Sequence, residues 1–292
     1  MISNLVIQKF GGTSLANIER IQAVANLIEQ SVQDGKEVVA VVSAMAGETQ
    51  RLIDLAKEVQ SEPDPREYDA LISSGEQVSV ALLAMALKEK NFLSKSYTAF
   101  QLGLKTDQIH GKARISSIDT SVLHEDLKKG IVPVITGFQG INESGDITTL
   151  GRGGSDTSAV ALAVALEADE CQIFTDVDGV YTTDPRVYDK AKKIDKLSFE
   201  EMLELSSLGA KVLQIRSVEF ASKFNMPIRV LSSFNKGDGT LIDKEDENLE
   251  DALISGVTYT KNDSKLIIRQ VPDVPGICLL YTSPSPRDMW TS

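Results

Sequence analysis

Short apolar runs alternate along this chain with longer segments whose apolar residues recur at helical spacing. The run at 37–45 (EVVAVVSAM) is mostly apolar, as expected for a strand that is covered on both faces. The segment 17–35 places Ile18, Ile21 and Ile28 on one helical face and ends at Gly35. This alternation predicts an α/β fold, with helices packed around a mainly parallel sheet. Strands are predicted at 4–10, 37–45, 130–141, 170–177 and 227–233, helices at 17–35 and 76–90, and one or two helices within 198–225.

The motif KFGGTS (9–14) follows the first predicted strand and precedes the first predicted helix. At such a junction the main-chain N–H groups and the helix N-terminus favour an anion. Glycine allows a phosphate to approach the main chain closely, and Lys9 adds a positive charge. The alternative is a simple tight turn between strand and helix. A Walker loop is excluded, because no G-x-x-x-x-G-K-[ST] pattern occurs here.

A second glycine-rich motif, LGRGGSDTSA (150–159), also stands before a helical segment. Arg152 can hold a carboxylate through two parallel hydrogen bonds. Asp156 stands where the dinucleotide fingerprint G-x-G-x-x-G needs its last glycine, so that fingerprint is excluded. Alternatively, Ser155 or Asp156 merely caps the helix, but a cap explains only one residue of the motif.

Two further loops carry acidic residues near predicted element ends. TDVDGVYTTDPR (175–186) follows a predicted strand, and ligands of open α/β sheets bind beyond the carboxyl ends of strands. Its alternatives are a surface turn or a calcium loop, although the EF-hand spacing is absent. In SSGEQVS (73–79), Glu76 stands where a helix begins, either as a dipole partner or to bind a substrate ammonium group.

The triplet Asp-Thr-Ser occurs at 119–121 and at 156–158, which raises the possibility of an aspartic peptidase. Such an enzyme needs two carboxylates side by side. The second triplet runs into an Ala-rich helix and the first lies in a polar stretch, so neither context suits that site.

Charge and cysteine content exclude several classes of protein. The net charge of −12 argues against a non-specific nucleic-acid binder, because such proteins neutralise phosphates with clustered Lys and Arg. Cys171 and Cys278 stand far apart and give neither a disulfide framework nor a zinc spacing. The first residues lack a signal-peptide pattern, and no apolar run approaches the ~20 residues of a membrane span. We therefore expect a cytoplasmic protein without nucleic-acid or membrane partners.

The composition changes after residue 235, where the predicted main domain (1–235) ends. Residues 236–251 contain seven acidic residues and two lysines, and we assign 236–255 to an acidic linker. Residues 256–277 start a new strand-like run and are too few for an independent domain. The remainder, 278–292, has neither helical nor strand periodicity. We expect it to be disordered or foreign to the protein, since it resembles translated sequencing-adapter sequence.

Seven motifs between residues 5 and 234 occur in a fixed order: KFGGTS, VVSAMAGET, SSGEQVS, TGFQG, LGRGGSDTSA, TDVDGVYTTDPR and GAKVLQIRSVEFASKFNMPIRVLSSF. Together they resemble the amino acid kinase family, and within it the members that phosphorylate L-aspartate. Siblings act on acetylglutamate, glutamate, carbamate or UMP, and the forms KFGGTS and VSAMAGET favour aspartate. The alternatives are another kinase of this family and a non-catalytic nucleotide-binding subunit.

The resemblance implies a three-layer α/β/α sandwich around a mainly parallel central sheet. It also implies ATP-dependent phosphorylation of the side-chain carboxylate of L-aspartate, giving 4-phospho-L-aspartate at the entry to lysine (through diaminopimelate), threonine and methionine synthesis. Mg²⁺ is expected to accompany ATP, held mainly by phosphate oxygens and water rather than by a protein metal site.

The resemblance also assigns roles to single residues. Lys9, Gly11 and Gly12 would hold the transferred phosphoryl group. Glu76 would bind the ammonium group of aspartate, and Arg152 its α-carboxylate. The remaining predicted aspartate-binding residues are Thr49, Gly153, Gly154 and Ser155. The predicted ATP-binding residues are Lys9, Phe10, Gly11, Gly12, Ser43, Thr175, Asp176, Tyr181, Thr182, Thr183, Asp184, Pro185, Arg186 and Lys211.

Lys9, Asp156 and Lys211 are the predicted catalytic residues. If both lysines point at one phosphoryl group, their like charges repel each other in a partly dry site. A carboxylate between them offsets this repulsion. We therefore expect Asp156 to lie within hydrogen-bond reach of Lys9, of Lys211 or of both.

Members that phosphorylate aspartate usually continue into two ACT domains, small regulatory modules that bind lysine or threonine. Residues 256–277 resemble the start of the first module. This predicts a catalytic domain without its regulatory part, which would not be inhibited by lysine or threonine. A homodimer is compatible with the resemblance, and loss of the ACT domains would weaken it.

Overall fold

The computed structural model describes residues 4–207, 212–245 and 256–257 of the 292-residue chain. Residues 1–259 form one compact unit, and a second unit comprises residues 260–292. Lys211, the predicted tail (278–292) and nearly all of the predicted ACT fragment (256–277) lie outside the described residues.

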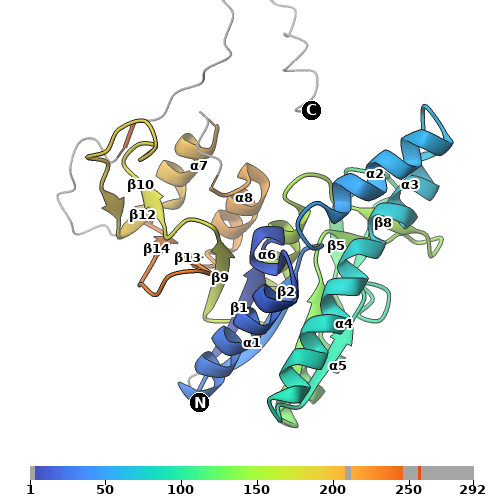
Figure 1. The fold of residues 1–292 in the computed structure, drawn as a ribbon, viewed down its shortest axis with the longest axis horizontal. Helices are drawn as coiled ribbons and strands as arrows, with labels where there is room; N and C mark the ends of the chain where they lie inside the picture. Colours follow the sequence, from blue (N-terminus) through green and yellow to red (C-terminus); the bar gives the residue numbers. More distant parts are fainter. Residues whose placement is uncertain (1–3, 208–211, 246–255, 258–292) are drawn as a thin grey trace, which may run out of the picture. The chain divides into compact units, whose positions relative to one another are not determined.

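Within the described residues, eight strands form the main sheet, in the spatial order β12 (Lys196–Ser198), β14 (Thr240–Asp243), β13 (Ile228–Ser232), β9 (Glu170–Thr175), β1 (Leu5–Phe10), β2 (Glu37–Val42), β6 (Val132–Thr136) and β3 (Ser94–Tyr97) (Figure 1). Neighbouring strands are parallel except for the pair β13 and β14. β1 lies between β2 and β9, so the chain crosses from one half of the sheet to the other at this strand. The predicted mainly parallel sheet is confirmed.

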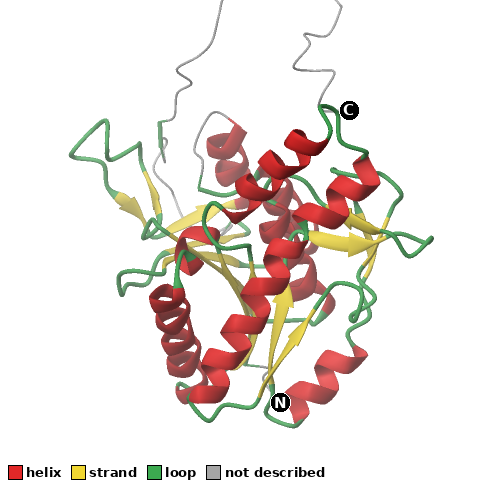
Figure 2. Ribbon diagram, turned by 45° about the vertical axis from the view of Figure 1, so that its right-hand side comes forward, coloured by secondary structure: helices red, strands yellow, loops and turns green. Residues whose placement is uncertain are grey.

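Helices cover both faces of the main sheet (Figure 2). Because successive strand residues point to opposite faces, β1 contributes to two separate cores. Leu5 and Ile7 belong to one core, and Val6 and Phe10 to the other. The result is the predicted three-layer α/β/α sandwich. The first core is closed by α5 (Ser121–Lys128), α6 (Gly154–Ala165), α7 (Phe199–Ser207) and α8 (Ile215–Phe224), and the second by α1 (Ile18–Gln33) and α4 (Ser74–Glu89).

α6 is the helix that positions the glycine-rich motif LGRGGSDTSA. It is buried from Gly154 to Ala163 and is apolar on all sides beyond its first turn. Such a helix is stable only inside a core, since it has no polar face for solvent. Its N-terminus is therefore fixed by packing against the sheet.

A smaller sheet lies beside the main one, with the strand order β5 (Ile115–Ser117), β4 (Lys105–Thr106), β7 (Gln139–Ile141) and β8 (Ile147–Thr149). The helices α2 (Glu48–Val59) and α3 (Pro65–Ile72) precede α4 in the chain, and α3 packs on β8. The single strand predicted at 130–141 is wrong, because the chain leaves the main sheet after β6. Phe138 adopts a φ of +70°, and β7 then joins the small sheet.

The predicted linker 236–255 begins too early. Residues 240–243 form β14, which pairs with both β12 and β13 in the main sheet. Thr240 and Ile242 are buried while Leu241 and Asp243 are partly exposed, which is the alternation of a strand. The surrounding acidic residues masked this short pattern in the sequence.

The predicted helical region 198–225 contains two helices, α7 and α8, with residues 208–214 between them. The run Pro65–Glu89, which comprises α3 and α4, is long and apolar enough to cross a membrane by length and composition, a feature that the sequence analysis overlooked. Half of its most apolar window is buried inside the domain, as in a core helix. The remaining described elements are η1 (Gly12–Leu15) and the hairpin of β10 (Val180–Tyr181) and β11 (Lys193–Ile194).

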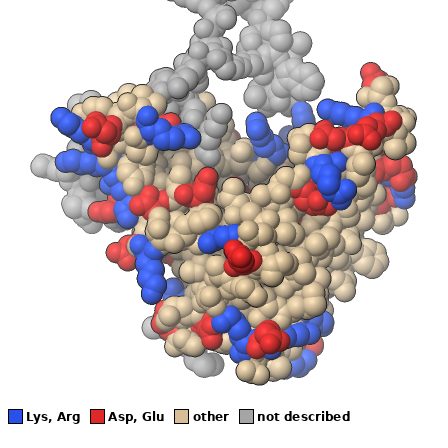
Figure 3. Space-filling model, viewed as in Figure 1, with Lys and Arg blue, Asp and Glu red and all other residues tan. Residues whose placement is uncertain are grey.

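On the face drawn in Figure 3, Lys and Arg side chains are interspersed with Asp and Glu. No broad patch of one sign appears on this face. This face shows no stripe of Lys and Arg of the kind that follows a phosphate backbone.

Candidate active site

Lys9 and Asp156 form a buried ion pair at the carboxyl end of the central strand. Leu5, Ile7 and Lys9 lie on the same side of β1, the side that α6 covers. Asp156 is in the first turn of α6, and its Oδ1 lies 2.6 Å from Nζ of Lys9. The two side chains are only 11% and 10% exposed. The predicted contact between Asp156 and Lys9 is confirmed, whereas Lys211 lies outside the described residues.

The glycines of LGRGGSDTSA are required by the backbone and by close packing. Gly151 and Gly153 have φ values of +77° and +72°, a region that other residues rarely adopt. A Cβ atom at Gly153 would lie 1.9 Å from Cγ of Gln214, the residue that precedes α8. Gly137, after β6, leaves room for Ser155 in the same way, because a Cβ at position 137 would lie 2.9 Å from Oγ of Ser155.

Glu76, in the first turn of α4, is a buried carboxylate with one free oxygen. Glu76 is only 3% exposed. The main-chain N–H of Ala44 donates to Oε1 at 3.0 Å. Oε2 is buried and has no hydrogen-bond partner among the described residues. Burial raises the pKa of Glu76 to about 7, although the Ala44 hydrogen bond acts in the opposite direction.

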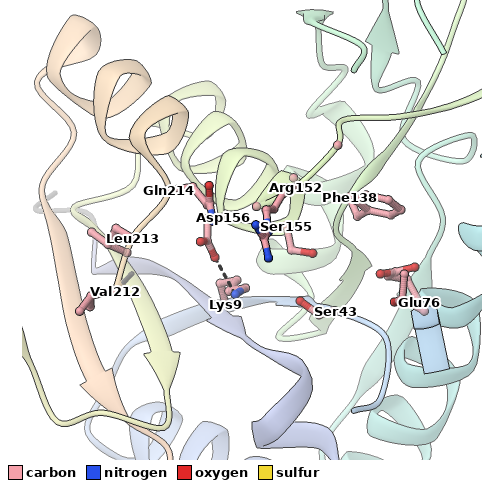
Figure 4. A pocket seen from close by; sticks show the side chains of 14 residues that line it. Lys9, Ser43, Glu76, Phe138, Arg152, Ser155, Asp156, Val212, Leu213 and Gln214 are labelled. Carbon is pink, nitrogen blue, oxygen red and sulfur yellow. Dashed lines mark ion pairs between the residues drawn. The ribbon is translucent and has the colours of Figure 1, made fainter. Parts of the chain in front are cut away.

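These groups meet in one cavity of about 290 Å³ (Figure 4). Figure 4 shows Glu76 on one side, the pair Lys9–Asp156 on the other, and Arg152 and Ser155 between them. Every predicted aspartate-binding residue is present: Thr49, Glu76, Arg152, Gly153, Gly154 and Ser155. Lys9, Ser43 and Asp156 complete the predicted set in the cavity. The sequence analysis missed Phe138, Gly151, Val212, Leu213 and Gln214, which also line it.

All five stand inside motifs named above, Gly151 in LGRGGSDTSA, Phe138 in TGFQG and residues 212–214 in GAKVLQ, but nothing in their residue types marked them as cavity-lining. Phe138 lines the cavity because the chain turns at positive φ between the two sheets. Residues 212–214 line it because α8 docks against α6. Neither the turn at Phe138 nor the docking of α8 on α6 can be predicted from a local pattern of residue types.

The predicted nucleotide residues near β1 are close to this cavity but differ in exposure. Gly11 and Gly12 are partly exposed, and a Cβ at Gly11 would lie 3.5 Å from Nζ of Lys9. Phe10 is fully buried and stacks on Phe174. Its main-chain carbonyl accepts a hydrogen bond from the N–H of Ser43. The side chain of Phe10 therefore belongs to the core and does not face the cavity.

The other predicted nucleotide residues follow β9 and surround the β10–β11 hairpin, and none of them lines the cavity. The hydroxyl of Tyr181 donates to Asp178 at 3.0 Å, and this bond is the main cause of its raised pKa. The guanidinium of Arg186 donates to both carboxylate oxygens of Asp184. The full set is Thr175, Asp176, Tyr181, Thr182, Thr183, Asp184, Pro185 and Arg186.

No cluster of three or more His, Cys, Asp or Glu residues that could bind a metal ion occurs in the part of the chain that the structure describes. Cys171 is buried in β9, and burial raises the pKa of its thiol. A thiol of this kind is unreactive. The charged side chains that line the cavity are those of Lys9, Glu76, Arg152 and Asp156.

Charged groups of both signs converge on a cavity in an α/β sandwich, and the comparisons with known proteins identify the family. The sequence model of the amino acid kinase family matches residues 4–232. An aspartate kinase of Stutzerimonas stutzeri is 56% identical over 281 residues, which cover 96% of this chain and 68% of the relative. This chain belongs to the amino acid kinase family.

Other similar proteins include further aspartate kinases. Aspartokinase 2 of Bacillus subtilis is 49% identical over 264 residues, covering 90% of this chain and 65% of the relative. The crystal structure of E. coli aspartokinase III with aspartate and ADP has a TM-score of 0.76 at 30% identity, covering 84% of this chain and 65% of that one. The crystal structure of aspartate kinase from Synechocystis has a TM-score of 0.74 at 48% identity, and the match covers 82% of this chain and 40% of that one. The chain thus spans about two thirds of the length of the curated relatives it matches.

Proposed function

We propose that this protein is an aspartate kinase, which transfers the γ-phosphoryl group of ATP to the side-chain carboxylate of L-aspartate. The observation that carries the proposal is the distribution of charge in the cavity. A buried carboxylate with a free oxygen (Glu76) lies on one side and a buried lysine (Lys9) on the other, with Arg152 between them.

L-Aspartate matches this distribution group by group. Its ammonium group would pair with Glu76, its α-carboxylate with Arg152, and its side-chain carboxylate would point toward Lys9. The cavity of about 290 Å³ is at the lower end of the range for ligand sites, which suits a small amino acid. Ser155 and Thr49 would complete the binding site, and both line the cavity.

The reaction needs positioning and charge stabilisation more than covalent catalysis. An oxygen of the aspartate side chain forms a bond to the γ-phosphorus while the bond from that phosphorus to the β–γ bridging oxygen breaks, releasing ADP. The attacking carboxylate is already ionised at neutral pH, so no general base is required. Lys9 would stabilise the charge on the transferred group, together with Gly11 and Gly12.

Asp156 would hold Lys9 in place from the side of α6. Its position in the first turn of a buried helix leaves it little freedom to move. We propose that Lys211 forms a second positive contact with the phosphates and that Asp156 separates the two lysines. Mg²⁺ would enter with ATP, bound mainly to phosphate oxygens, since the described residues offer no metal-binding cluster.

The nucleotide would bind beside this cavity, along the carboxyl ends of β1 and β9. This proposal rests on the neighbouring position of these two strands, which are parallel and adjacent. Thr175 ends β9 and Asp176 follows it directly, and Tyr181 to Arg186 come from the adjoining hairpin. The crevice beyond adjacent parallel strands is where α/β folds bind nucleotides.

We further propose that residues 256–277 belong to the first ACT module. The match to the S. stutzeri enzyme leaves only 11 of the 292 residues unaligned, so it extends through most of this segment. A cytoplasmic location and a homodimer are also proposed, on the resemblance to enzymes of amino-acid synthesis.

A substrate panel tests the proposed activity. The purified chain is incubated with MgATP and with aspartate, glutamate, N-acetylglutamate, carbamate or UMP, and ADP release is followed with a coupled assay. We expect turnover with L-aspartate alone, together with an acyl phosphate that hydroxylamine traps as a hydroxamate. Turnover with another acceptor identifies a sibling kinase, and the absence of turnover with all five contradicts a catalytic function.

A further inference from the structure

The glycine-rich loop is held from outside the cavity by Arg216, a residue of α8. One terminal nitrogen of its guanidinium donates to the main-chain carbonyl of Leu150 at 2.8 Å. The other donates to the carbonyl of Ala113 at 2.7 Å. Arg216 therefore bridges the first residue of LGRGGSDTSA to the loop that connects β4 and β5.

The same loops are fixed on their far side by Asp69, a fully buried carboxylate of α3. Its oxygens accept from the N–H of Thr149 at 3.0 Å, from the hydroxyl of Thr149 at 2.6 Å and from the N–H of Gly111 at 2.9 Å. The N–H of Ala113 also donates to the carbonyl of Thr149 at 2.9 Å. The chain entering the glycine-rich loop is thus bound to fixed groups on two sides.

Arg216 contributes to positioning the backbone rather than to a charge pair. Among the described residues it forms no ion pair with a carboxylate, and it does not line the cavity. Burial lowers the pKa of its guanidinium, with a further contribution from the nearby Arg114. A half-buried cation that donates to two main-chain carbonyls fixes their relative position, because the guanidinium is planar and rigid.

Arg216 also connects two walls of the cavity. Residues 212–214 form one wall and precede α8, and residues 151–154 form another. The two walls touch where Gln214 packs against Gly153. A shift of α8 relative to Leu150 would therefore displace Arg152, the residue that follows Gly151.

We propose that Arg216 is a positioning residue for the acceptor, which sets the orientation of Arg152 toward the α-carboxylate of L-aspartate by anchoring the start of the glycine-rich loop. The proposal rests on the function proposed above. It predicts a specific kinetic signature, because a group that holds the substrate equally in the ground and transition states affects KM more than kcat.

The test compares Arg216→Met with Arg229→Met in the full chain. Arg229 is a suitable control, since it is also partly buried and donates to the carbonyl of Asp238, but it pairs with Glu170 away from the cavity. We expect Arg216→Met to raise the KM for aspartate about tenfold, the scale on which small displacements of positioning groups act, with the KM for ATP nearly unchanged. Equal KM values for aspartate in the two variants would overturn the proposal.

A double-mutant cycle separates positioning from loss of folded protein. If Arg216 acts through Arg152, Arg216→Met should have little further effect on the KM for aspartate in an Arg152→Met background, whereas additive effects would contradict the proposal. A purely structural defect lowers apparent kcat and the unfolding temperature but leaves KM unchanged, and that pattern too would contradict it. Arg216→Lys, which can still donate to a carbonyl, should restore part of the affinity.

Measurements on the wild-type chain distinguish failure of the proposed function from failure of the role proposed for Arg216. If it does not phosphorylate aspartate, the proposed function fails, and the effect of Arg216 is then not measured on KM. In that case aspartate binding, followed by calorimetry on the wild type and Arg216→Met, replaces the kinetic measurement. Equal dissociation constants in the two proteins would overturn the role of Arg216 alone.

Discussion

The two sides of the proposed active site differ in how far their groups are fixed before any ligand binds. On the acceptor side, Glu76 is buried and accepts a hydrogen bond from the N–H of Ala44, whereas Arg152 is exposed. On the nucleotide side, the side chain of Arg186 is 88% exposed and pairs with Asp184, two residues earlier in the same loop. Glu76 is therefore held by tertiary packing, whereas the pair Arg186–Asp184 lies within one loop.

This difference has an energetic consequence for the two substrates. A buried and fixed group loses little conformational entropy when it binds, so its full interaction is available to the ligand. An exposed arginine must give up its local carboxylate partner and its rotational freedom. We therefore expect mutations on the acceptor side to have large and selective effects, and those on the nucleotide side to have small ones.

The largest effect is expected where the two sides meet, at Lys9. Lys9→Met should lower kcat by about 10²–10³-fold, because it removes a fixed positive charge at the transferred phosphoryl group. The measurement is the initial rate of ADP release at saturating substrates. Lys57→Met, at an exposed lysine of α2, is the control and should retain full activity. A kcat for Lys9→Met within a factor of about two of the wild type would exclude this role.

The next effect separates the two sides. Glu76→Gln keeps the shape of the side chain but removes its charge, and it should raise the KM for aspartate by about 30-fold or more, as expected for truncating a buried charge pair. The KM for ATP should stay the same. Glu89→Gln, at an exposed position of the same helix, serves as the matched control. A parallel rise in both KM values would show that the two sides are not independent.

The pH dependence of aspartate binding should report the same residue. Ionised Glu76 is needed to pair with the ammonium group, so kcat/KM for aspartate should fall as the pH drops below about 7, approaching tenfold per pH unit. Rates are measured between about pH 5.5 and 8.5 for the wild type. A profile that is flat over this range would contradict the raised pKa.

Stability should change with pH in the opposite direction. The pKa of Glu76 is raised from 4.5 to about 7 by burial in the folded state. The free energy of unfolding therefore has its full value below pH 4.5, where Glu76 is neutral in both states. It falls by about 3 kcal/mol as the pH rises through about 7, because the folded protein must then bury the charged carboxylate. Glu76→Gln should remove this loss. Urea unfolding at pH 5 and pH 8 measures it, and an unchanged pH dependence in the variant would argue against Glu76 as the cause.

The smallest effect is expected at Arg186. Arg186→Ala should raise the KM for ATP by about two- to fivefold, in line with an exposed ion pair, and leave the KM for aspartate unchanged. Arg66→Ala removes another exposed and paired arginine, on α3, and should change neither KM. A rise of more than about a hundredfold in the KM for ATP in Arg186→Ala would show that the nucleotide side is as fixed as the acceptor side.

Sequence reasoning succeeded where a function depends on local composition. Glycines with a charge at a strand-to-helix junction mark both KFGGTS and LGRGGSDTSA. The contact of Asp156 with Lys9 was predicted from the roles that the family resemblance assigns to the two lysines, combined with the repulsion expected between them. The parallel sheet was equally visible, because fully covered strands have continuous apolar runs. The signals for the two glycine-rich motifs and for the strands each lie within about ten neighbouring residues, whereas the contact of Lys9 with Asp156 joins two distant motifs.

Residues that reach the cavity by tertiary packing could not be predicted in this way. Phe138 turns at positive φ, where its carbonyl accepts from Leu150, and its ring would meet a Cβ at Gly154. Gln214 reaches the cavity only because α8 docks on α6. The strand β14 was not predicted for a related reason. Its two buried residues, Thr240 and Ile242, stand in an acidic segment, and they form a strand only because β12 and β13 pair with it.

The raised pKa of Glu76 also links substrate capture to the proton concentration of the surroundings. At pH 7 about half of the empty sites carry a proton on this carboxylate, since its pKa is about 7. If the ammonium group of aspartate binds against it as proposed, it favours the ionised form, so the site would release that proton as aspartate enters. Each binding event then releases a fraction of a proton to the buffer. The heat of binding should accordingly vary with the ionisation enthalpy of the buffer, and the cavity acts as a proton-exchanging site although the phosphoryl transfer itself moves no proton.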